Sequence, residues 1–287
     1  MGYRHKKAQA AMQYLMTYGW ALIVITVVLI ALYGFGVFNF GSLTPKAPPG
    51  GCQVYKQTGL PSSLGGTCNN ELPQFAGVFG GSQYITVNTA GFPTGSSPRT
   101  LTAWINIPSY SNGGCGQEMA TGYGSGTCSG EYTGLGPDGS GYISFAGCGD
   151  DYHSSLMASL NTWVFIASTY TSGSTQVTIY MNSQSVTGSL ASALSTNLGG
   201  GAIGAWGTGC QLTGKIADVQ LYNASLPPAD IQNLYMEGIG GVPIDLNYLV
   251  GWWPLNGNAN DYSGNNHTST VQGVTFTPNW INGYSSP

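Results

Sequence analysis

The sequence predicts a mainly β protein: one hydrophobic N-terminal helix, then a β-sandwich or jelly roll with one short helix. Three observations support this prediction. Residues 19–38 contain no charged side chain, and the chain beyond residue 52 consists of short apolar alternations separated by Gly, Ser and Asn. The composition is 6% charged yet 12% aromatic, which is typical of an ordered protein with an uncharged polar surface.

The hydrophobic segment GWALIVITVVLIALYGFGVF at 19–38 is twenty residues long. At about 1.5 Å per residue it spans the roughly 30 Å of a bilayer core. Arg4, Lys6 and Lys7 precede it, so the positive-inside rule predicts a cytoplasmic N-terminus with the bulk of the chain outside the cell. A cleaved secretory signal would have a shorter apolar core of about 7–15 residues and a small-residue cleavage site. A membrane anchor is therefore the simplest interpretation.

The stretch KKAQAAMQYLMTYGWALIVI at 6–25 closely resembles the archaeal class III signal peptide of type IV pilin-like proteins. The resemblance implies a leader at 1–8, which a prepilin-type peptidase removes between Ala8 and Gln9. It also implies a retained pilin-like helix at 9–40. The family usually carries Glu at the position of Gln13, where the carboxylate pairs with a neighbouring subunit's N-terminal amine. An amide cannot neutralise an ammonium group, so processing is more strongly implied than assembly into a homo-oligomeric filament. Gln13 is either a filament-register residue or a residue near the lipid headgroups.

Residues 41–51, which begin GSLTPKAPPG, are rich in Pro and Gly and predict a linker. The domain that follows, 52–287, contains β-branched and aromatic segments bounded by turn residues. These predict strands at 84–87, 100–107, 141–147, 163–170, 175–182, 214–222 and 248–255. One helix is predicted at 225–238, with Pro and Asp at its start, Gly at its end, and Ile231, Leu234 and Tyr235 on one face.

From YITV at residue 84 to GKIADVQLYNASLPPADIQNLY at residue 214, the order of segments resembles the LamG-like, or concanavalin-like, jelly-roll family. The resemblance covers about residues 75–237. The family usually opens with a segment like LVGWWPLNGNANDYSGNNHTSTVQGVTF, which here comes last, at 249–276. A second domain copy is one explanation, but only eleven residues follow Phe276. Circular permutation is the favoured alternative, with 249–276 completing the sheet and Trp252 or Trp253 in the core.

The chain has an even number of cysteines and no C-x-x-C pair, which favours disulfides over zinc. Six cysteines allow 15 pairings. Chain neighbours, Cys52–Cys68 and Cys115–Cys128, are the simplest, and buried free thiols are the alternative. Asn223 and Asn266 head N-x-[ST] sequons in predicted turns and are glycosylation candidates. The disulfide candidates are Cys52, Cys68, Cys115, Cys128, Cys148 and Cys210.

Charge argues against a nucleic-acid partner, because from Gln9 onward four basic residues accompany eleven acidic ones, a balance of −7. Enzymes of the jelly-roll type usually carry Glu residues two or four apart on one strand, and this pattern is absent. Asp150 and Asp151 could form a site with His153, but a solvated loop is the simpler interpretation. We therefore expect no enzymatic activity; the alternative is an exported polysaccharide-active enzyme.

Related domains often hold calcium at the sandwich rim, and the resemblance places such a site at 258–266. Its candidate ligands are Asp261, Asn260, Ser263, Asn265 and Asp218. The alternative is that Asp261 braces its own turn through backbone hydrogen bonds.

Sugar binding is the family's usual role and requires exposed aromatics. Trp104 and Trp163 lie in strand patterns and are expected in the core. A long loop at 109–140, which carries two cysteines, is the expected ligand site. The alternative is a disulfide-braced surface loop that binds no ligand. The function predicted is a pilin-like or membrane-anchored surface protein that displays a lectin-like domain for adhesion or carbohydrate binding. The aromatics expected near turns are Tyr110, Tyr123, Tyr132, Tyr152 and Trp206.

Overall fold

The structure is a computed structural model. It describes residues 20–21, 23–28, 55–56, 64–65, 75–128, 130–239 and 241–278. The chain divides into two units, 1–45 and 46–287. In the first unit, residues 20–21 and 23–28 are helical. Within the described residues, no helix has both the length and the apolar character needed to cross a membrane.

Several predictions of the N-terminal region lie outside the described residues. They are the leader at 1–8 with its cleavage point between Ala8 and Gln9, the register residue Gln13, the linker at 41–51, and Cys52 and Cys68.

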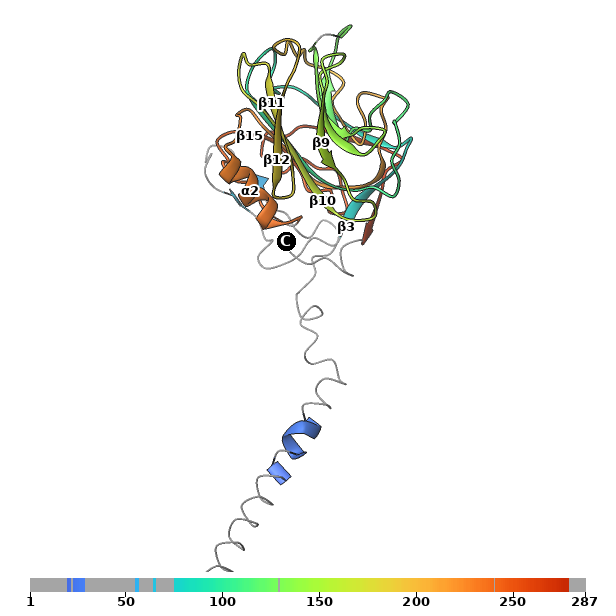
Figure 1. Ribbon diagram of the computed structural model, residues 1–287, viewed down its shortest axis with the longest axis vertical. Helices are drawn as coiled ribbons and strands as arrows, with labels where there is room; N and C mark the ends of the chain where they lie inside the picture. The colour runs from blue at the N-terminus through green and yellow to red at the C-terminus, as the bar shows by residue number, and fades with distance from the viewer. Residues whose placement is uncertain are drawn as a thin grey trace, which may run out of the picture. The chain divides into compact units, whose positions relative to one another are not determined.

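The second unit is a β-sandwich of two sheets (Figure 1). In the larger sheet, β15 pairs with β14 beside the path, and the other strands follow the order β12-β11-β10-β5-β14-β3-β17. Its strands are β3 (Phe75–Gly80), β5 (Arg99–Asn106), β10 (Val164–Tyr170), β11 (Gln176–Met181), β12 (Gln184–Ser189), β14 (Thr213–Tyr222), β15 (Leu249–Trp253) and β17 (Thr275–Pro278).

The smaller sheet has the order β16-β4-β13-β6-β7-β8-β9. Its strands are β4 (Tyr84–Val87), β6 (Thr121–Gly124), β7 (Tyr132–Pro137), β8 (Tyr142–Ala146), β9 (Tyr152–Met157), β13 (Ala202–Ile203) and β16 (Ser269–Gln272). Two short strands, β1 (Tyr55–Lys56) and β2 (Leu64–Gly65), pair separately.

The C-terminal strands enter both sheets. β15 pairs antiparallel with β14, and β17 pairs with β3. β16 pairs with β4 in the other sheet. The chain from 249 to 278 is therefore part of the same sandwich, and both Trp252 and Trp253 are buried.

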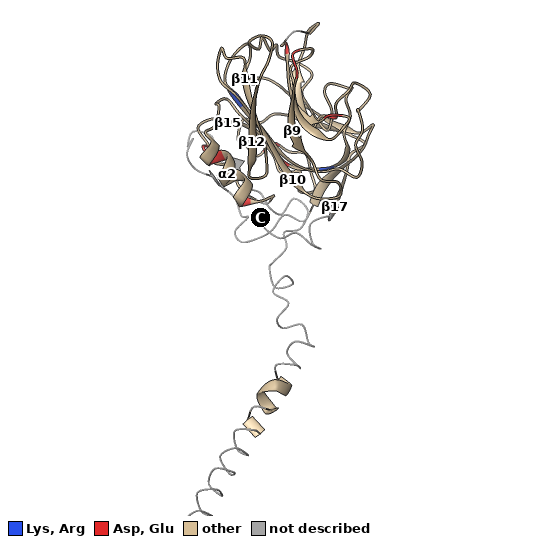
Figure 2. Ribbon diagram, viewed as in Figure 1, with Lys and Arg blue, Asp and Glu red and all other residues tan. Residues whose placement is uncertain are grey.

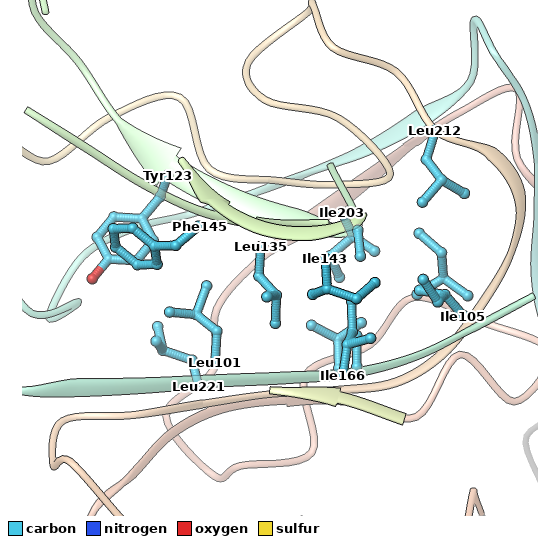
Figure 3. Packing of buried hydrophobic residues seen from close by; sticks show 14 of the residues in the cluster. Leu101, Ile105, Tyr123, Leu135, Ile143, Phe145, Ile166, Ile203, Leu212 and Leu221 are labelled. Carbon is cyan, nitrogen blue, oxygen red and sulfur yellow. The ribbon is translucent and has the colours of Figure 1, made fainter. Parts of the chain in front are cut away.

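The main core lies between the sheets (Figure 3). Leu135, Ile143 and Phe145 face it from the smaller sheet, while Leu101 and Ile166 face it from the larger one. Each is at most 2% exposed. Burying a side chain of this size stabilises the fold by about 1.5–3 kcal/mol. The alternation of inward and outward residues along each strand fixes the register, because a one-residue slip would expose this whole set.

The helix α2 (Pro228–Glu237) covers the outer face of the larger sheet near β15 (Figure 1). Prolines at its start suit the first turn, where no intrahelical N–H is needed, and Gly238 follows its last residue with a φ of 74°. Ile231 and Leu234 are buried, and the ring of Tyr235 stacks on Trp104 with centroids 6.0 Å apart. Trp104 is thus a core residue, as predicted.

Arg99, on β5, is a fully buried cation between the sheets. No carboxylate among the described residues pairs with it. Its guanidinium also lies 5.9 and 5.6 Å from the ring centroids of Tyr123 and Tyr170. Burial lowers the pKa of Arg99. The guanidinium donates hydrogen bonds of 2.8–3.2 Å to the hydroxyls of Tyr123, Thr133 and Thr196 and to the carbonyls of Gly95 and Ser97.

Two predictions about residues 109–140 are wrong. The segment is not one long loop, because it contains β6 and β7. Their glycine-rich sequences, TGYG and YTGLGP, hid the strands, since Gly is depleted in strands. Cys115 pairs with Cys210, and Cys128 pairs with Cys148, so chain neighbours Cys115 and Cys128 are not bonded. The strand pairing, and not closeness in sequence, decides which cysteines meet.

We predict that Arg99→Ala lowers the free energy of unfolding by about 3 kcal/mol or more. The substitution leaves buried hydroxyl and carbonyl groups without their donor. Urea unfolding of the purified protein measures the change. Ser185→Ala, at an exposed position of β12, is the control and should stay within about 0.5 kcal/mol of the parent. An Arg99→Ala protein as stable as this control would refute the bridging role.

Candidate functional site

The outer face of the smaller sheet has a floor of small residues. Leu135 and Phe145 point into the core, so their strand neighbours point outward. On β7 these outward neighbours are Gly134 and Gly136. Gly134 pairs with Ala146 of β8, and Gly136 pairs with Ser144 of β8. A flat, small-residue floor lets other segments lie directly on the sheet.

The segment preceding β6 uses this space. A Cβ on Gly136 would collide with the backbone of Glu118, and a Cβ on Gly134 would come within 2.7 Å of the sulfur of Met119. The Met119 amide donates to the carbonyl of Cys210 at 2.9 Å, beside the Cys115–Cys210 disulfide. Both glycines are therefore required by close approach.

Trp206 is presented by a tight turn. The Trp206 amide donates to the Gly209 carbonyl and the Gly209 amide donates to the Trp206 carbonyl, each at 2.9 Å. Gly207, between them, adopts a φ of 57°. The Trp206 ring meets Tyr132 edge to face, with centroids 3.8 Å apart. Tyr132 is held in turn by its hydroxyl, which donates to the Gly126 carbonyl at 2.8 Å. The pair is half-buried, so part of each ring faces solvent.

These groups surround a pocket of about 140 Å³. Trp206 and Tyr132 line it together with Met119 and polar residues Gln117 and Asp151. The Gln117 amide oxygen accepts from the Ser144 hydroxyl at 2.8 Å, and the Asp151 carboxylate accepts from the Gly147 amide at 2.8 Å. Cys115, Cys148 and Cys210 also line the pocket, so both disulfides border it. Aromatic walls with a few fixed polar atoms are the usual composition of a small-molecule site.

The structure separates the predicted aromatics. Tyr132 and Trp206 line the pocket. Tyr123 is buried and donates to the Pro93 carbonyl at 2.9 Å, so its predicted exposure is wrong. Tyr110 and Tyr152 are half-buried and pack against the core.

The grouping of Asp150, Asp151 and His153, considered above as the alternative to a solvated loop, does not form. His153 pairs with Asp138 at 2.9 Å, and Asp150 is buried with its carboxylate on the amides of Ala191 and Ser192. Asp151 alone faces the pocket. Gln117 and Met119 were not identified from the sequence as pocket residues. The one sequence feature that could have indicated them is the nearby Cys115, whose disulfide borders the pocket.

Three of the calcium candidates, Asp261, Ser263 and Asn265, are used by the fold itself. The Asp261 carboxylate accepts from the amides of Trp252, Ser263 and His267 and from the Ser263 hydroxyl, at 2.8–3.1 Å. These donors fill the roughly four acceptor sites of a carboxylate. Asn265 donates its amide to the Leu249 and Val250 carbonyls. The donor set does not fit a calcium ion, and the arrangement favours the turn-bracing alternative.

Asp218 is buried on the larger sheet. It occupies the bulge of β14, with a φ of 48°, and accepts from the Trp252 indole at 2.8 Å and from the Gln220 amide at 3.0 Å. Burial raises the pKa of Asp218 to about 7. Glu118 is a second buried acid, whose carboxylate accepts from the Thr213 amide at 3.0 Å; burial raises its pKa to about 7 as well.

Asn223 and Asn266 are exposed in loops, and their glycosylation stays a prediction.

The fold and the pocket define a lectin-like β-sandwich. A family model described as the concanavalin A-like lectin/glucanases superfamily matches residues 79–232, which is more than half of the chain. The chain belongs to this superfamily.

Solved structures are similar to the same sandwich. A protein from Bacteroides ovatus described as a carbohydrate-binding protein is 21% identical with a TM-score of 0.54; the match covers 72% of this chain and 60% of that one. A heptameric SAP-like pentraxin from Limulus polyphemus is 11% identical with a TM-score of 0.49, over 73% of this chain and 97% of that one. This chain thus spans less than two thirds of the Bacteroides protein. Among curated proteins, none matches it.

We predict that the free energy of unfolding falls, by an order of a few kcal/mol, as pH rises from about 4 to 8. Folding raises the pKa values of Glu118 and Asp218, so between about pH 4 and 7 the folded state holds protons that the unfolded state has lost. Their stabilisation is complete below the unfolded pKa and is lost as pH rises to 7. His267 acts oppositely below its ordinary pKa, because burial lowers its pKa.

Urea unfolding at each pH measures this dependence. Glu118→Gln and Asp218→Asn should each flatten the slope between pH 5 and 7. A parent protein that gains stability across that interval would contradict the assignment.

Proposed function

We propose that this chain is a membrane-anchored, extracytoplasmic protein whose sandwich binds carbohydrate in the Trp206 pocket. The observation that carries the proposal is the half-exposed pair of aromatic rings, Trp206 and Tyr132, beside fixed polar groups. The carbohydrate-binding description of the Bacteroides protein, which shares the fold, is consistent with it.

Sugar rings have apolar faces of C–H groups and a rim of hydroxyls. Trp206 offers a flat surface for the apolar face. Gln117 and Asp151, both fixed by hydrogen bonds, offer partners for the hydroxyls. The pocket is smaller than the roughly 300–1,000 Å³ of sites for drug-sized molecules, so it suits one sugar unit of a longer glycan.

Binding without hydrolysis is the favoured form of the proposal. Glycosidases generally place two carboxyl groups across the bond that they cleave. The pocket lining contains one carboxylate, Asp151. Glu118, the buried acid with a raised pKa, hydrogen-bonds to Thr213 and is not among the residues that line the pocket.

The N-terminal sequence supports display at the cell surface. The basic cluster, the uncharged stretch at 19–38 and the resemblance to archaeal type IV pilin-like signals agree on an anchored protein with an outer domain. A prepilin-type peptidase is the proposed processing partner, and filament assembly through the retained helix is the weaker part of the proposal because of Gln13.

We predict that Trp206→Ala weakens glycan binding at least about tenfold, since truncating a central aromatic removes the largest apolar contact. Glycan-array screening of the full chain in detergent identifies the ligands, and calorimetry measures their affinity. Tyr248→Ala removes a ring that is 51% exposed but outside the pocket, and should leave binding unchanged. Equal glycan affinity for the parent protein and the Trp206→Ala variant would show that this pocket is not the glycan-binding site.

Mass spectrometry of the protein from its native membrane should find Gln9 as the first residue. Substituting Ala8 and Gln9 should abolish the mass shift that removal of residues 1–8 produces. A mature chain that still begins at Met1 would refute the pilin-like processing and leave the simple anchor.

A further inference from the structure

The pocket has a single charged side chain in its described lining, Asp151. One oxygen of its carboxylate accepts from the Gly147 amide at 2.8 Å. The turn that carries Asp151 is rigid for two reasons. Cys148 is bonded to Cys128, and Gly147 lies so close to the Asp150 carbonyl that a Cβ there would collide with it. Asp151 is therefore a fixed negative charge at the pocket.

Within the part of the chain that the structure describes, no lysine or arginine pairs with this carboxylate. Between Arg99 and Lys215 the sequence contains no lysine or arginine, while it contains five acidic residues. This interval supplies every described residue that lines the pocket. Figure 2 shows how few charged residues the sandwich carries. The acidic residues of the interval are Glu118, Glu131, Asp138, Asp150 and Asp151.

The nearest cations in sequence are directed elsewhere. The guanidinium of Arg99 is buried between the sheets and donates to neutral groups there. Lys215 is on β14, in the opposite sheet. His153 is paired with Asp138. An anionic group in the pocket would thus meet Asp151 without a compensating cation among the described lining residues.

We propose that the pocket selects uncharged or amino sugars and rejects sugars that carry carboxylate, sulfate or phosphate. This inference rests on the proposed carbohydrate binding and adds the ligand class. A hydroxyl donates a hydrogen bond to the carboxylate, and an ammonium group donates a stronger, charge-assisted one. A carboxylate on the sugar would lose water on entering and face a like charge, which disfavours its charged form.

The test uses β-1,4-linked trimers with one backbone and three charges: glucose, glucosamine and glucuronate. The same neutral, amino and acidic comparison is made for every backbone that a glycan array retains. The full chain in detergent is titrated at low ionic strength, because salt screens these interactions. We expect the amino form to bind about two- to fivefold more tightly than the neutral form, as a partly exposed ion pair allows, and the acidic form at least about tenfold more weakly.

Asp151→Asn supplies the decisive comparison. In this variant the ratio of the affinities for the amino and neutral forms should fall to about one. The affinity for the acidic form should rise toward that for the neutral form. Asp245→Asn is the matched control, since Asp245 is exposed, lies outside the pocket and has a φ of 47° that asparagine tolerates.

The outcomes separate the two proposals. Glycan binding that depends on Trp206 but favours acidic forms, or that keeps its charge preference in Asp151→Asn, overturns this inference and leaves carbohydrate binding intact. Binding of no glycan by the parent protein overturns both.

Discussion

The buried guanidinium of Arg99 is the interaction on which the sandwich and its pocket both depend. The Arg99 side chain extends from β5 of the larger sheet and donates hydrogen bonds to Tyr123 of β6 and Thr133 of β7, which belong to the smaller sheet. A cation in this position has lost its water, so it is tolerable only because every face meets an oxygen or an aromatic ring. One of these strands, β7, also carries Gly134 in the floor of the pocket on its other side. The position of the floor is therefore set from inside the core.

The small residues of that floor explain how a sheet becomes a site. Gly134 and Gly136 carry no side chain on the outer face, so the chain at Glu118 and Met119 can lie against the strand. The Cys115–Cys210 disulfide closes a loop of 95 residues and joins this segment to the turn of Trp206. In the chain-entropy description a bond across so long a loop contributes several kcal/mol, about 4–5. Stability and site geometry thus arise from the same covalent link.

This arrangement also shows how far the sequence could be interpreted. Strands rich in β-branched residues, such as β10 and β11, follow from alternation alone, and α2 follows from its prolines and Gly238. β6 and β7 could not be predicted, because glycines make a strand look like a loop, and here they mark close approach. Arg99 reads as a surface charge until its partners, up to 97 residues away, come together. The sequence predicts Trp206 as an exposed aromatic residue. The polar groups beside it, Gln117 and Asp151, can be identified only from the folded structure.

The scarcity of charge gains meaning from the positions of the remaining charged groups. Asp218 and Glu118 are buried with raised pKa values, so the folded state is more stable when these two carboxyl groups are protonated. Arg99 is enclosed in the core. At the pocket, Asp151 is half-buried and is positioned by the Gly147 amide. Because a charge acts most strongly where no opposite charge competes, the single carboxylate in the described lining of the pocket can bias which ligands enter. The scarcity of charge around it therefore makes Asp151 the dominant electrostatic feature of the pocket.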